Sequence, residues 1–286
     1  MNKNEINIIL DQIKDRQNSA SQTNFEGYSP TEMHVILYAT HSQNSPFQLI
    51  DMPEEAYKNI PIFNQIKFLG DYLIKNGEIN LTKTGALPTK IVLDLYLQGY
   101  LQDRMLEKGI PKQMKETDSL VTHLPRVILE LSGLVKKRYG KLSLTKVAPK
   151  ILASNKELLK NIWETYTIKF NWSYNDGYGN NNVGQMGYAY TLILLSKYGD
   201  VEKPDNFYAE KYFKAFSMLR NIPDPGYSTI EKYTNNCFSY RTIDVFMRFF
   251  GLAKINGTHR FLSDTYTISK SEVFDKLIYC LPPAYL

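Results

Sequence analysis

The stretch that decides the fold is residues 131–146, LSGLVKKRYGKLSLTK. A helix is expected to end at Gly133, because glycine adopts the left-handed conformation that closes a helix without strain. The apolar residues 134–135 and 142–144 lie on either side of an Arg-Tyr-Gly turn, which predicts two short strands of a hairpin. A new helix is expected after Thr145, whose hydroxyl suits a helix cap. The stretch therefore predicts a helix, a hairpin and a second helix in succession.

The same pattern recurs twice elsewhere in the chain. Residues 249–278 read FFGLAK, then a polar turn, then YTISK and a helical run. Residues 73–92 hold a shorter version, with LIKNG, then INLTKTG and a helical run. Each copy predicts a helix that ends near glycine, a short strand or hairpin, and a helix that opens on Thr or Ser. The spacing between copies is irregular, which indicates a tandem of modules rather than a solenoid.

The central copy also predicts a local hydrophobic core. The inward side chains of its hairpin have to meet the helices on either side of it. We expect one cluster of six aliphatic residues: Leu131, Leu134, Leu142, Leu144, Ile151 and Leu152.

The remaining sequence is mostly helical in pattern, with clear start signals. Ser29 and Ser154 each precede a Glu by three residues, which is typical of a capping box, and Ser269 with Glu272 repeats the signal. Residues 171–184 are rich in Asn and Gly, which favours a turn-rich connector and a domain boundary. The expected divisions are an N-terminal helix and linker at 1–28, a first module at 29–117, a second at 118–170, a helical insert at 171–238 and a third module at 239–286.

The hairpin-and-helix portion of this pattern resembles bacterial winged-helix regulators, in which a strand that ends in Leu-Thr precedes a helix. Leu144-Thr145-Lys146 and Leu81-Thr82-Lys83 hold those positions, and Ile268-Ser269-Lys270 is a variant. The layout is also similar to uncharacterised bacterial proteins that join such modules with helical inserts. The resemblance implies a mainly α-helical fold with small β-hairpins, built from tandem winged-helix-like units with a helical insert. It implies DNA binding or protein docking as the function.

Bulk composition narrows the class of protein. The chain has 286 residues, 43% hydrophobic and 22% charged, which is typical of a globular protein. The net charge of +5 permits contact with nucleic acid without requiring it. Cys237 and Cys280 match no metal or redox spacing, and two buried thiols are expected. No signal core or membrane-spanning run is visible, so we expect no membrane association and a cytoplasmic location.

The densest positive charge in the sequence lies on the central hairpin. Lys136, Lys137, Arg138 and Lys141 place four positive charges within six residues. A protruding turn of this kind is suited to contact phosphates, and these four residues are the candidate nucleic-acid-binding site. A solvated hairpin end, where Lys and Arg prevent edge pairing, is the alternative interpretation.

The helices before each hairpin are weaker candidates for reading bases. The helix predicted over 119–132 carries His123, Arg126 and Glu130, and the helix over 62–75 carries Asn64, Gln65, Lys67, Asp71 and Lys75. The helix over 239–250 carries Arg241, Asp244 and Arg248. Each contains an acid that would repel phosphate, which argues against strong DNA binding by every copy.

The sequence contains no motif typical of a catalytic or metal-binding site. The histidines His34, His41, His123 and His259 are scattered, so no metal or cofactor is expected, and no nucleophile motif is present. We therefore expect a non-enzymatic protein that is associated with nucleic acid or has a regulatory role. A protein-interaction scaffold that does not bind DNA is the first alternative, and an enzyme with a composite site assembled from distant residues is the second. A continuous positive face would favour DNA, an apolar groove a protein partner, and a deep pocket with His or carboxylates an enzyme.

Overall fold

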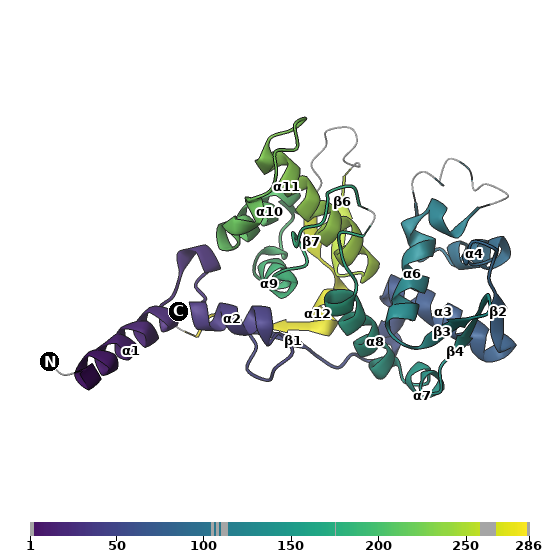
Figure 1. Cartoon of the computed structure of the whole chain (residues 1–286), viewed down its shortest axis with the longest axis horizontal. Coiled ribbons are helices and arrows are strands. Elements are labelled where there is room, and N and C mark those ends of the chain that lie inside the picture. The colour runs from purple at the N-terminus through teal and green to yellow at the C-terminus, as the bar shows by residue number, and fades with distance from the viewer. Residues whose placement is uncertain are drawn as a thin grey trace. The chain divides into compact units, whose positions relative to one another are not determined.

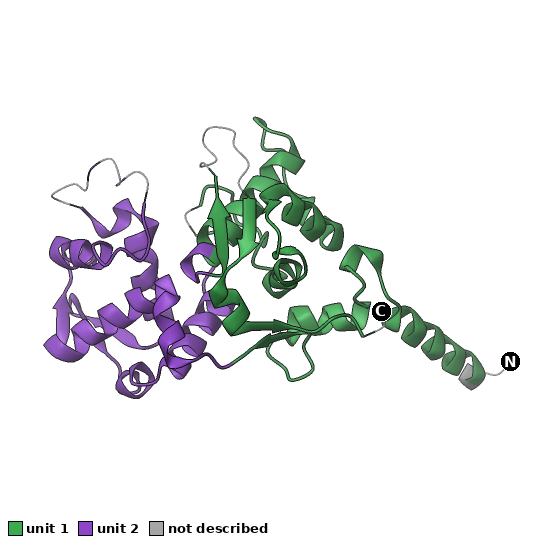
Figure 2. Cartoon of the chain, turned by 180° about the vertical axis from the view of Figure 1, so that it is seen from behind, with its two compact units in different colours: residues 1–50, 172–247, 252–286 green, residues 51–171, 248–251 purple. Residues whose placement is uncertain are grey.

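The computed structural model describes residues 3–103, 106, 109, 114–174, 176–257 and 267–284. The chain is mainly helical with small antiparallel sheets of two or three strands, which confirms the predicted mainly α-helical content with small β elements (Figure 1). It divides into two compact units (Figure 2). Unit 1 comprises residues 1–50, 172–247 and 252–286, and unit 2 comprises residues 51–171 and 248–251. Unit 2 is therefore inserted into the sequence of unit 1.

Unit 2 combines helices with one three-stranded sheet. Its longer elements are α3 (Pro61–Asn76), β2 (Glu78–Asn80), α4 (Thr89–Tyr96), α6 (Leu120–Leu131), β3 (Val135–Arg138), β4 (Lys141–Leu144), α7 (Ala148–Leu152) and α8 (Asn155–Glu164). Short 3₁₀ turns cover Glu54–Asn59 and Glu116–Asp118, and a π-helical turn, Thr165–Lys169, extends α8. The helix predicted over 62–75 is confirmed as α3, and the helix predicted over 119–132 as α6.

The sheet of unit 2 has β4 as its central strand, in the order β2-β4-β3 with both pairs antiparallel. Leu142 lies opposite Ile79 of β2 and Lys137 of β3. Leu142 and Ile79 are both buried, so this set of positions faces the core. The predicted boundary at 117–118 therefore falls within one sheet, because β2 comes from the expected first module and β3 and β4 come from the second.

The predicted aliphatic cluster is correct in its centre and wrong at one end. Leu134, Leu142 and Leu152 are buried, and Leu144 and Ile151 are half-buried. Leu131 is 42% exposed. It is the last residue of α6, and helical spacing places it one turn after Val127, which is itself only half-buried, at the edge of the buried face.

Unit 1 contains two small sheets and the remaining helices. Its elements are α1 (Lys3–Ser19), α2 (Pro30–Tyr38), β1 (Phe47–Leu49), α9 (Tyr188–Tyr198), β5 (Lys203–Pro204), α10 (Asp205–Ala215), α11 (Ile230–Phe238), β6 (Ala253–Asn256), β7 (Thr267–Lys270), α12 (Glu272–Leu277) and β8 (Ile278–Cys280). A long π-helical segment, Ser239–Met247, continues α11. β1 pairs with β8, and β5, β7 and β6 form a three-stranded sheet with β7 in the centre.

The two three-stranded sheets have the same topology. In unit 2 the order of elements is α3, β2, α4, α6, β3, β4, and in unit 1 it is α9, β5, α10, α11, β6, β7. In both, the last strand lies between the other two. The hairpin expected in 253–268 is present as the pair of β6 and β7.

The glycines before the two hairpins also occupy corresponding places. Gly133 and Gly251 both have positive φ, and each is followed by a fully buried leucine, Leu134 or Leu252. The carbonyl of Leu134 accepts a hydrogen bond from Thr145 N–H, and that of Leu252 accepts one from Ser271 N–H. These contacts define the correspondence between the hairpins, with Leu142 of β4 matched to Ile268 of β7.

Two of the three predicted helix starts are confirmed. Ser29 forms a complete capping box with Glu32 at the start of α2, and the Ser154 hydroxyl accepts from Glu157 N–H at the start of α8. The start predicted at Ser269 is wrong, because β7 continues through Lys270 to complete its pairing with β6. The cap of α12 is Ser271, which accepts from Phe274 N–H.

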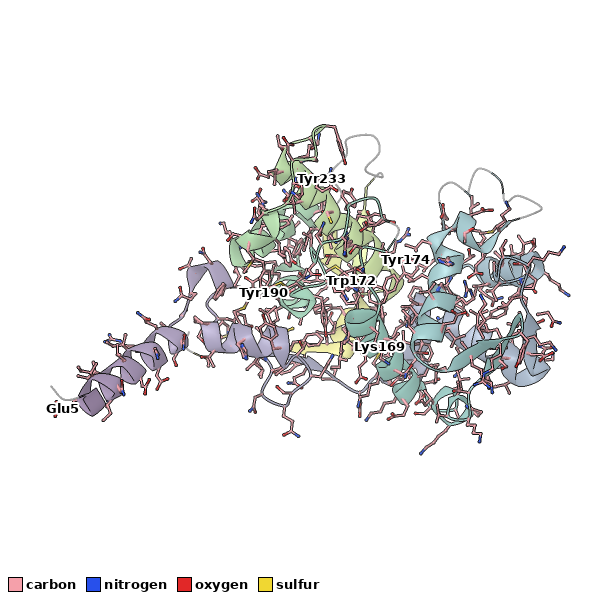
Figure 3. The ribbon with its side chains drawn as sticks, viewed as in Figure 1. Glu5, Lys169, Trp172, Tyr174, Tyr190 and Tyr233 are labelled. Atoms are coloured by element: carbon pink, nitrogen blue, oxygen red, sulfur yellow. The ribbon has the colours of Figure 1, made fainter. Side chains whose placement is uncertain are left out.

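The aromatic side chains of α10 belong to the core of unit 1. Tyr208, Tyr212 and Phe213 are buried, as is Phe216 directly after the helix, and Phe207 is half-buried. By contrast, α1 exposes Ile6, Ile9 and Ile13; its side chains are drawn in Figure 3, where Glu5 is labelled. Across the described part of the chain, no helix has both the length and the apolar character needed to cross a membrane.

The burial of Leu142 and the exposure of Leu131 make a matched test of the core. Leu142→Ala is expected to lower the free energy of unfolding by about 2–5 kcal/mol, because it leaves a cavity beneath the central strand. Leu131→Ala is expected to change it by less than about 1 kcal/mol, because the side chain is already part-hydrated. Urea unfolding followed by circular dichroism measures both. Equal decreases in the two variants would contradict this assignment of the core.

Candidate nucleic-acid interface

The hairpin of β3 and β4 turns over only two residues, Tyr139 and Gly140. Both have positive φ, 50° and 73°, which is the backbone pattern of the tight turns that match the twist of paired strands. The carbonyl of Gly140 accepts a hydrogen bond from Leu81 N–H at 2.8 Å, so the end of β2 supports the turn. The turn is therefore held both by the paired strands that it joins and by the residue after β2, and the register of β3 with β4 is fixed.

This register divides the four candidate positive charges between the two faces of the sheet. Side chains alternate along a strand, and Lys137 shares a face with the buried Leu142. Lys136, Arg138 and Lys141 lie on the opposite, outer face, where Arg138 is directly across from Lys141. All four side chains are exposed. The structure thus brings three of the candidates onto one surface and places the fourth on the other side.

Two of the four charges have partners within unit 2. The Lys137 ammonium donates to the Gly85 carbonyl at 3.2 Å, across the inner edge of the hairpin. Lys141 forms an ion pair with Glu78 of β2 at 2.5 Å. Both members of this pair are about half exposed, so water screens the interaction and Lys141 keeps much of its field.

Tyr139 forms the tip of the hairpin and is 100% exposed. It follows Arg138 directly and is separated from Lys141 by a single residue. Tyr139 was not predicted as a site residue from the sequence. The available signal was its place before glycine in a two-residue turn, where Asn or Asp is the usual choice.

The helix before this hairpin is α6, and it directs toward the protein interior the side chains that were predicted to read bases. Arg126 is buried, and His123 and Glu130 are half-buried. All three belong to a polar network around Glu116, whose side chain is fully buried. Arg126 pairs with Glu116 and with Glu130, and His123 Nδ1 lies 3.3 Å from the Glu116 carboxylate.

The surroundings of Glu116 stabilise its charged form. Burial by itself would raise the pKa of Glu116, but hydrogen bonds from His123, from Leu87 N–H and from Arg126 outweigh it and lower the pKa below the ordinary 4.5. Leu87 N–H donates at 2.6 Å, which ties the loop before α4 to this network. The network thus fastens α6 to its neighbours and makes the helix a structural element.

The other two candidate base-reading helices each bury one of their candidate side chains, although Asp71 and Lys75 on α3 are exposed. Gln65 on α3 is buried and donates to the Val121 carbonyl at 3.1 Å. Arg241, in the π-helical segment of unit 1, is 1% exposed. It pairs with Asp176 and donates to the carbonyls of Gly179, Asn181 and Val183.

Arg241 therefore organises the Asn- and Gly-rich stretch that the sequence marks as a connector. Each carbonyl of a turn-rich segment needs a donor when it is buried, and one guanidinium has five N–H groups to offer. Trp172 and Tyr174 at the start of this stretch are labelled in Figure 3. The segment is rich in turns, as expected, and Arg241 holds it against the rest of unit 1.

Net charge is distributed unevenly between the units. Unit 2 carries twenty Lys and Arg against thirteen Asp and Glu, a net charge of +7, and unit 1 carries fourteen against sixteen, a net charge of −2. The overall +5 therefore conceals one basic and one slightly acidic unit. The basic hairpin lies on the basic unit, so the local and the wider fields have the same sign.

The paired strands of the hairpin of unit 1 carry less positive charge than those of its counterpart. By the pairing register, the positions that match Lys136, Lys137, Arg138 and Lys141 are Lys254, Ile255, Asn256 and Thr267. Of these only Lys254 is positive.

No protein-family model, curated protein or solved structure matches this chain.

The Glu116 network predicts a dependence of stability on acid. Because the pKa of Glu116 is lower in the folded chain than in the unfolded chain, its contribution is present above about pH 4.5 and disappears as the pH falls through the folded value. Glu116→Gln is expected to lower the free energy of unfolding at pH 7 by up to about 3–5 kcal/mol, because it removes the fully buried acidic partner of Arg126 and leaves only the half-buried Glu130. Its acid dependence should be shallower than that of the native protein.

Glu78→Gln is the matched control, since it removes one carboxylate from an exposed ion pair. It is expected to cost less than about 1 kcal/mol. Urea unfolding at pH 7 and at several values down to pH 3 measures both variants. A native-like acid dependence in Glu116→Gln would contradict the role given to the carboxylate.

Proposed function

We propose that the protein binds nucleic acid through the hairpin of unit 2, in a regulatory rather than an enzymatic role, and that both three-stranded sheets belong to winged-helix units. In this proposal the hairpin of β3 and β4 is the wing of one unit, and the hairpin of β6 and β7 is the wing of the other. The observation that carries the proposal is the surface formed by Lys136, Arg138 and Lys141 on the outer face of a hairpin with a fully exposed tip, within a unit of net charge +7.

The topology supports the winged-helix part of the proposal. A helix, a strand, two helices and a hairpin follow one another, and the last strand inserts between the first strand and the second. This arrangement occurs in both units, which also fits a tandem. The shorter copy of the sequence pattern at 73–92 then supplies the first strand of one unit, and β5 is its equivalent in the other.

The geometry favours contact with the phosphate backbone over the reading of bases. Base edges are read by donors and acceptors that reach into a groove, and the polar groups of α6 are bound to each other instead. Lys and Arg on a hairpin reach phosphates, which are present at every sequence. Binding is therefore expected to tolerate changes of sequence and to weaken steeply with salt.

Salt dependence tests this proposal directly. Replacement of Lys136, Lys137, Arg138 and Lys141 by Ala is expected to reduce affinity for a mixed-sequence duplex. The slope of log affinity against log salt should flatten by up to about 3 units, at about 0.9 for each phosphate that is no longer neutralised. Fluorescence anisotropy at four salt concentrations measures the slope, and circular dichroism checks the fold.

A second quadruple variant controls for total charge. Lys58, Lys90, Lys160 and Lys169 are exposed residues of unit 2 that lie outside the hairpin. Their replacement by Ala removes the same four charges and should leave most of the slope in place. An equal effect of both quadruple variants would move the site away from the hairpin, and a native protein that does not bind at low salt would refute the proposal.

Single substitutions separate the two faces of the hairpin. Arg138→Ala is expected to weaken binding more than Lys137→Ala, because the Lys137 ammonium is directed to the Gly85 carbonyl on the inner side. Anisotropy at one low salt concentration is sufficient to compare them. The reverse order would place the binding surface on the inner face.

For unit 1 the alternative of a protein-docking role has specific support. Of the four strand positions that match the basic residues of the unit 2 hairpin, only Lys254 is positively charged. Unit 1 as a whole is slightly acidic. A winged-helix unit of this composition is poorly suited to phosphate. Lys254→Ala is accordingly expected to leave nucleic-acid affinity unchanged, and a decrease comparable to that of Arg138→Ala would assign unit 1 a share of the binding.

A further inference from the structure

We propose that Tyr139 stacks on an unpaired nucleobase, so that the hairpin of unit 2 prefers single-stranded DNA to a fully paired duplex of the same length. This inference rests on the proposed function, since it specifies which form of nucleic acid the hairpin binds. It assigns a role to a residue whose side chain adds no packing to the fold.

The backbone at Tyr139 is the first observation. Its φ of 50° lies in the left-handed region, which residues with a β-carbon rarely adopt. The two positions of such a turn are usually Asn or Asp followed by Gly, because these residues enter the left-handed region at least cost. Gly140 follows that preference and Tyr139 does not. A bulky residue held in this conformation is a feature found most often at binding sites.

The exposure of Tyr139 is the second observation. The side chain is 100% exposed, so its ring is not covered by any of the residues that the structure describes. Among the described residues of unit 2, the other exposed aromatic side chain is Tyr100, which is only 42% exposed. Tyr139 therefore offers both faces of its ring from the end of a supported turn.

The neighbours of Tyr139 are the third observation. Arg138 and Lys141 pair across the turn on the outer face, and Lys136 lies two residues before Arg138 along the same face. Proteins that bind single strands without sequence preference combine basic side chains along the backbone with aromatic rings under the bases. Cations beside an exposed ring meet this description, because they can hold phosphates while the ring meets a base.

The base that stacks has to be unpaired. In a duplex each base is already stacked on both sides, and insertion of a ring requires unstacking, which costs free energy. In a single strand the bases are accessible without that cost. Tyr139 should therefore add to affinity for single strands and add little for a blunt duplex, where the positive charges act alone.

Tyr139→Asn is the decisive variant, because Asn suits the left-handed turn. It is expected to fold, with a melting temperature equal to or above that of the native protein. Its affinity for a labelled oligothymidylate should fall by about 5- to 150-fold, which corresponds to the removal of one stacked base. Its affinity for a duplex of the same length should change by less than about 2-fold, and its salt slope should stay native, since the positive charges remain.

Two further variants define what the ring contributes. Tyr139→Phe keeps the ring and should retain native affinity for the single strand. Tyr227→Asn removes another strongly exposed tyrosine, 79% exposed on unit 1, and should leave affinity unchanged. Anisotropy titrations with all four proteins at one salt concentration give the comparison.

The outcomes separate this inference from the proposed function. If the native protein binds duplex with a steep salt slope while Tyr139→Asn binds the single strand as tightly as the native protein, stacking is refuted and the proposed function stands. If Tyr139→Phe weakens binding as much as Tyr139→Asn, the hydroxyl acts instead of the ring and stacking is refuted. An equal decrease on duplex and single strand also overturns the preference. If the native protein binds neither ligand, both proposals fail.

Discussion

Burial of one leucine on a central strand determines how the basic hairpin of unit 2 presents its side chains. Leu142 is fully buried, and β4 pairs on both sides, with β2 and with β3. Because side chains alternate along a strand, this single inward position fixes which residues of both neighbours face outward. A slip of one residue would carry Lys136, Arg138 and Lys141 into the core. Ile268 holds the same position in unit 1, where it is likewise buried and central. The same framework therefore displays a basic surface in one unit and a nearly neutral one in the other.

Much of this architecture could be predicted from local sequence. Serine caps such as Ser29 and Ser154, glycine stops such as Gly133 and Gly251, and the two hairpins all depend on short-range preferences that a few neighbouring residues reveal. The assignment of strands to sheets could not be predicted in the same way. β5 has two residues, Lys203 and Pro204, with no alternation to mark it, and nothing near β2 indicates that its partner begins about sixty residues later. The division of the four hairpin charges was within reach, because alternation from a buried Leu142 places Lys137 on the inner face.

The buried arginines explain why the base-reading helices could not be judged from sequence. Arg126 and Arg241 look like exposed residues when only the helical pattern is considered. Acids and carbonyls surround each of them. Arg126 meets Glu116 from the preceding turn and Glu130 from its own helix, and Arg241 meets Asp176 and three backbone carbonyls of another segment. Those partners lie up to 65 residues away in the chain. A buried guanidinium with several acceptors fixes a unique arrangement of the loops around it. Because its N–H groups are occupied by those acceptors, it is not available to bind a ligand at the surface.

The pairing of β1 with β8 has a consequence for biosynthesis. The Tyr28 hydroxyl donates to the Leu281 carbonyl, 253 residues further along the chain, and β1 has β8 as its partner. At ribosomal rates of about 5–20 residues per second, the N-terminal segment of unit 1 waits about 13–50 s for this partner to be made. The main segment of unit 2, residues 51–171, is complete well before that time. A nascent chain therefore carries an open strand edge at β1 until β8 has been made, and a stop codon after residue 251 would leave that edge permanently unpaired.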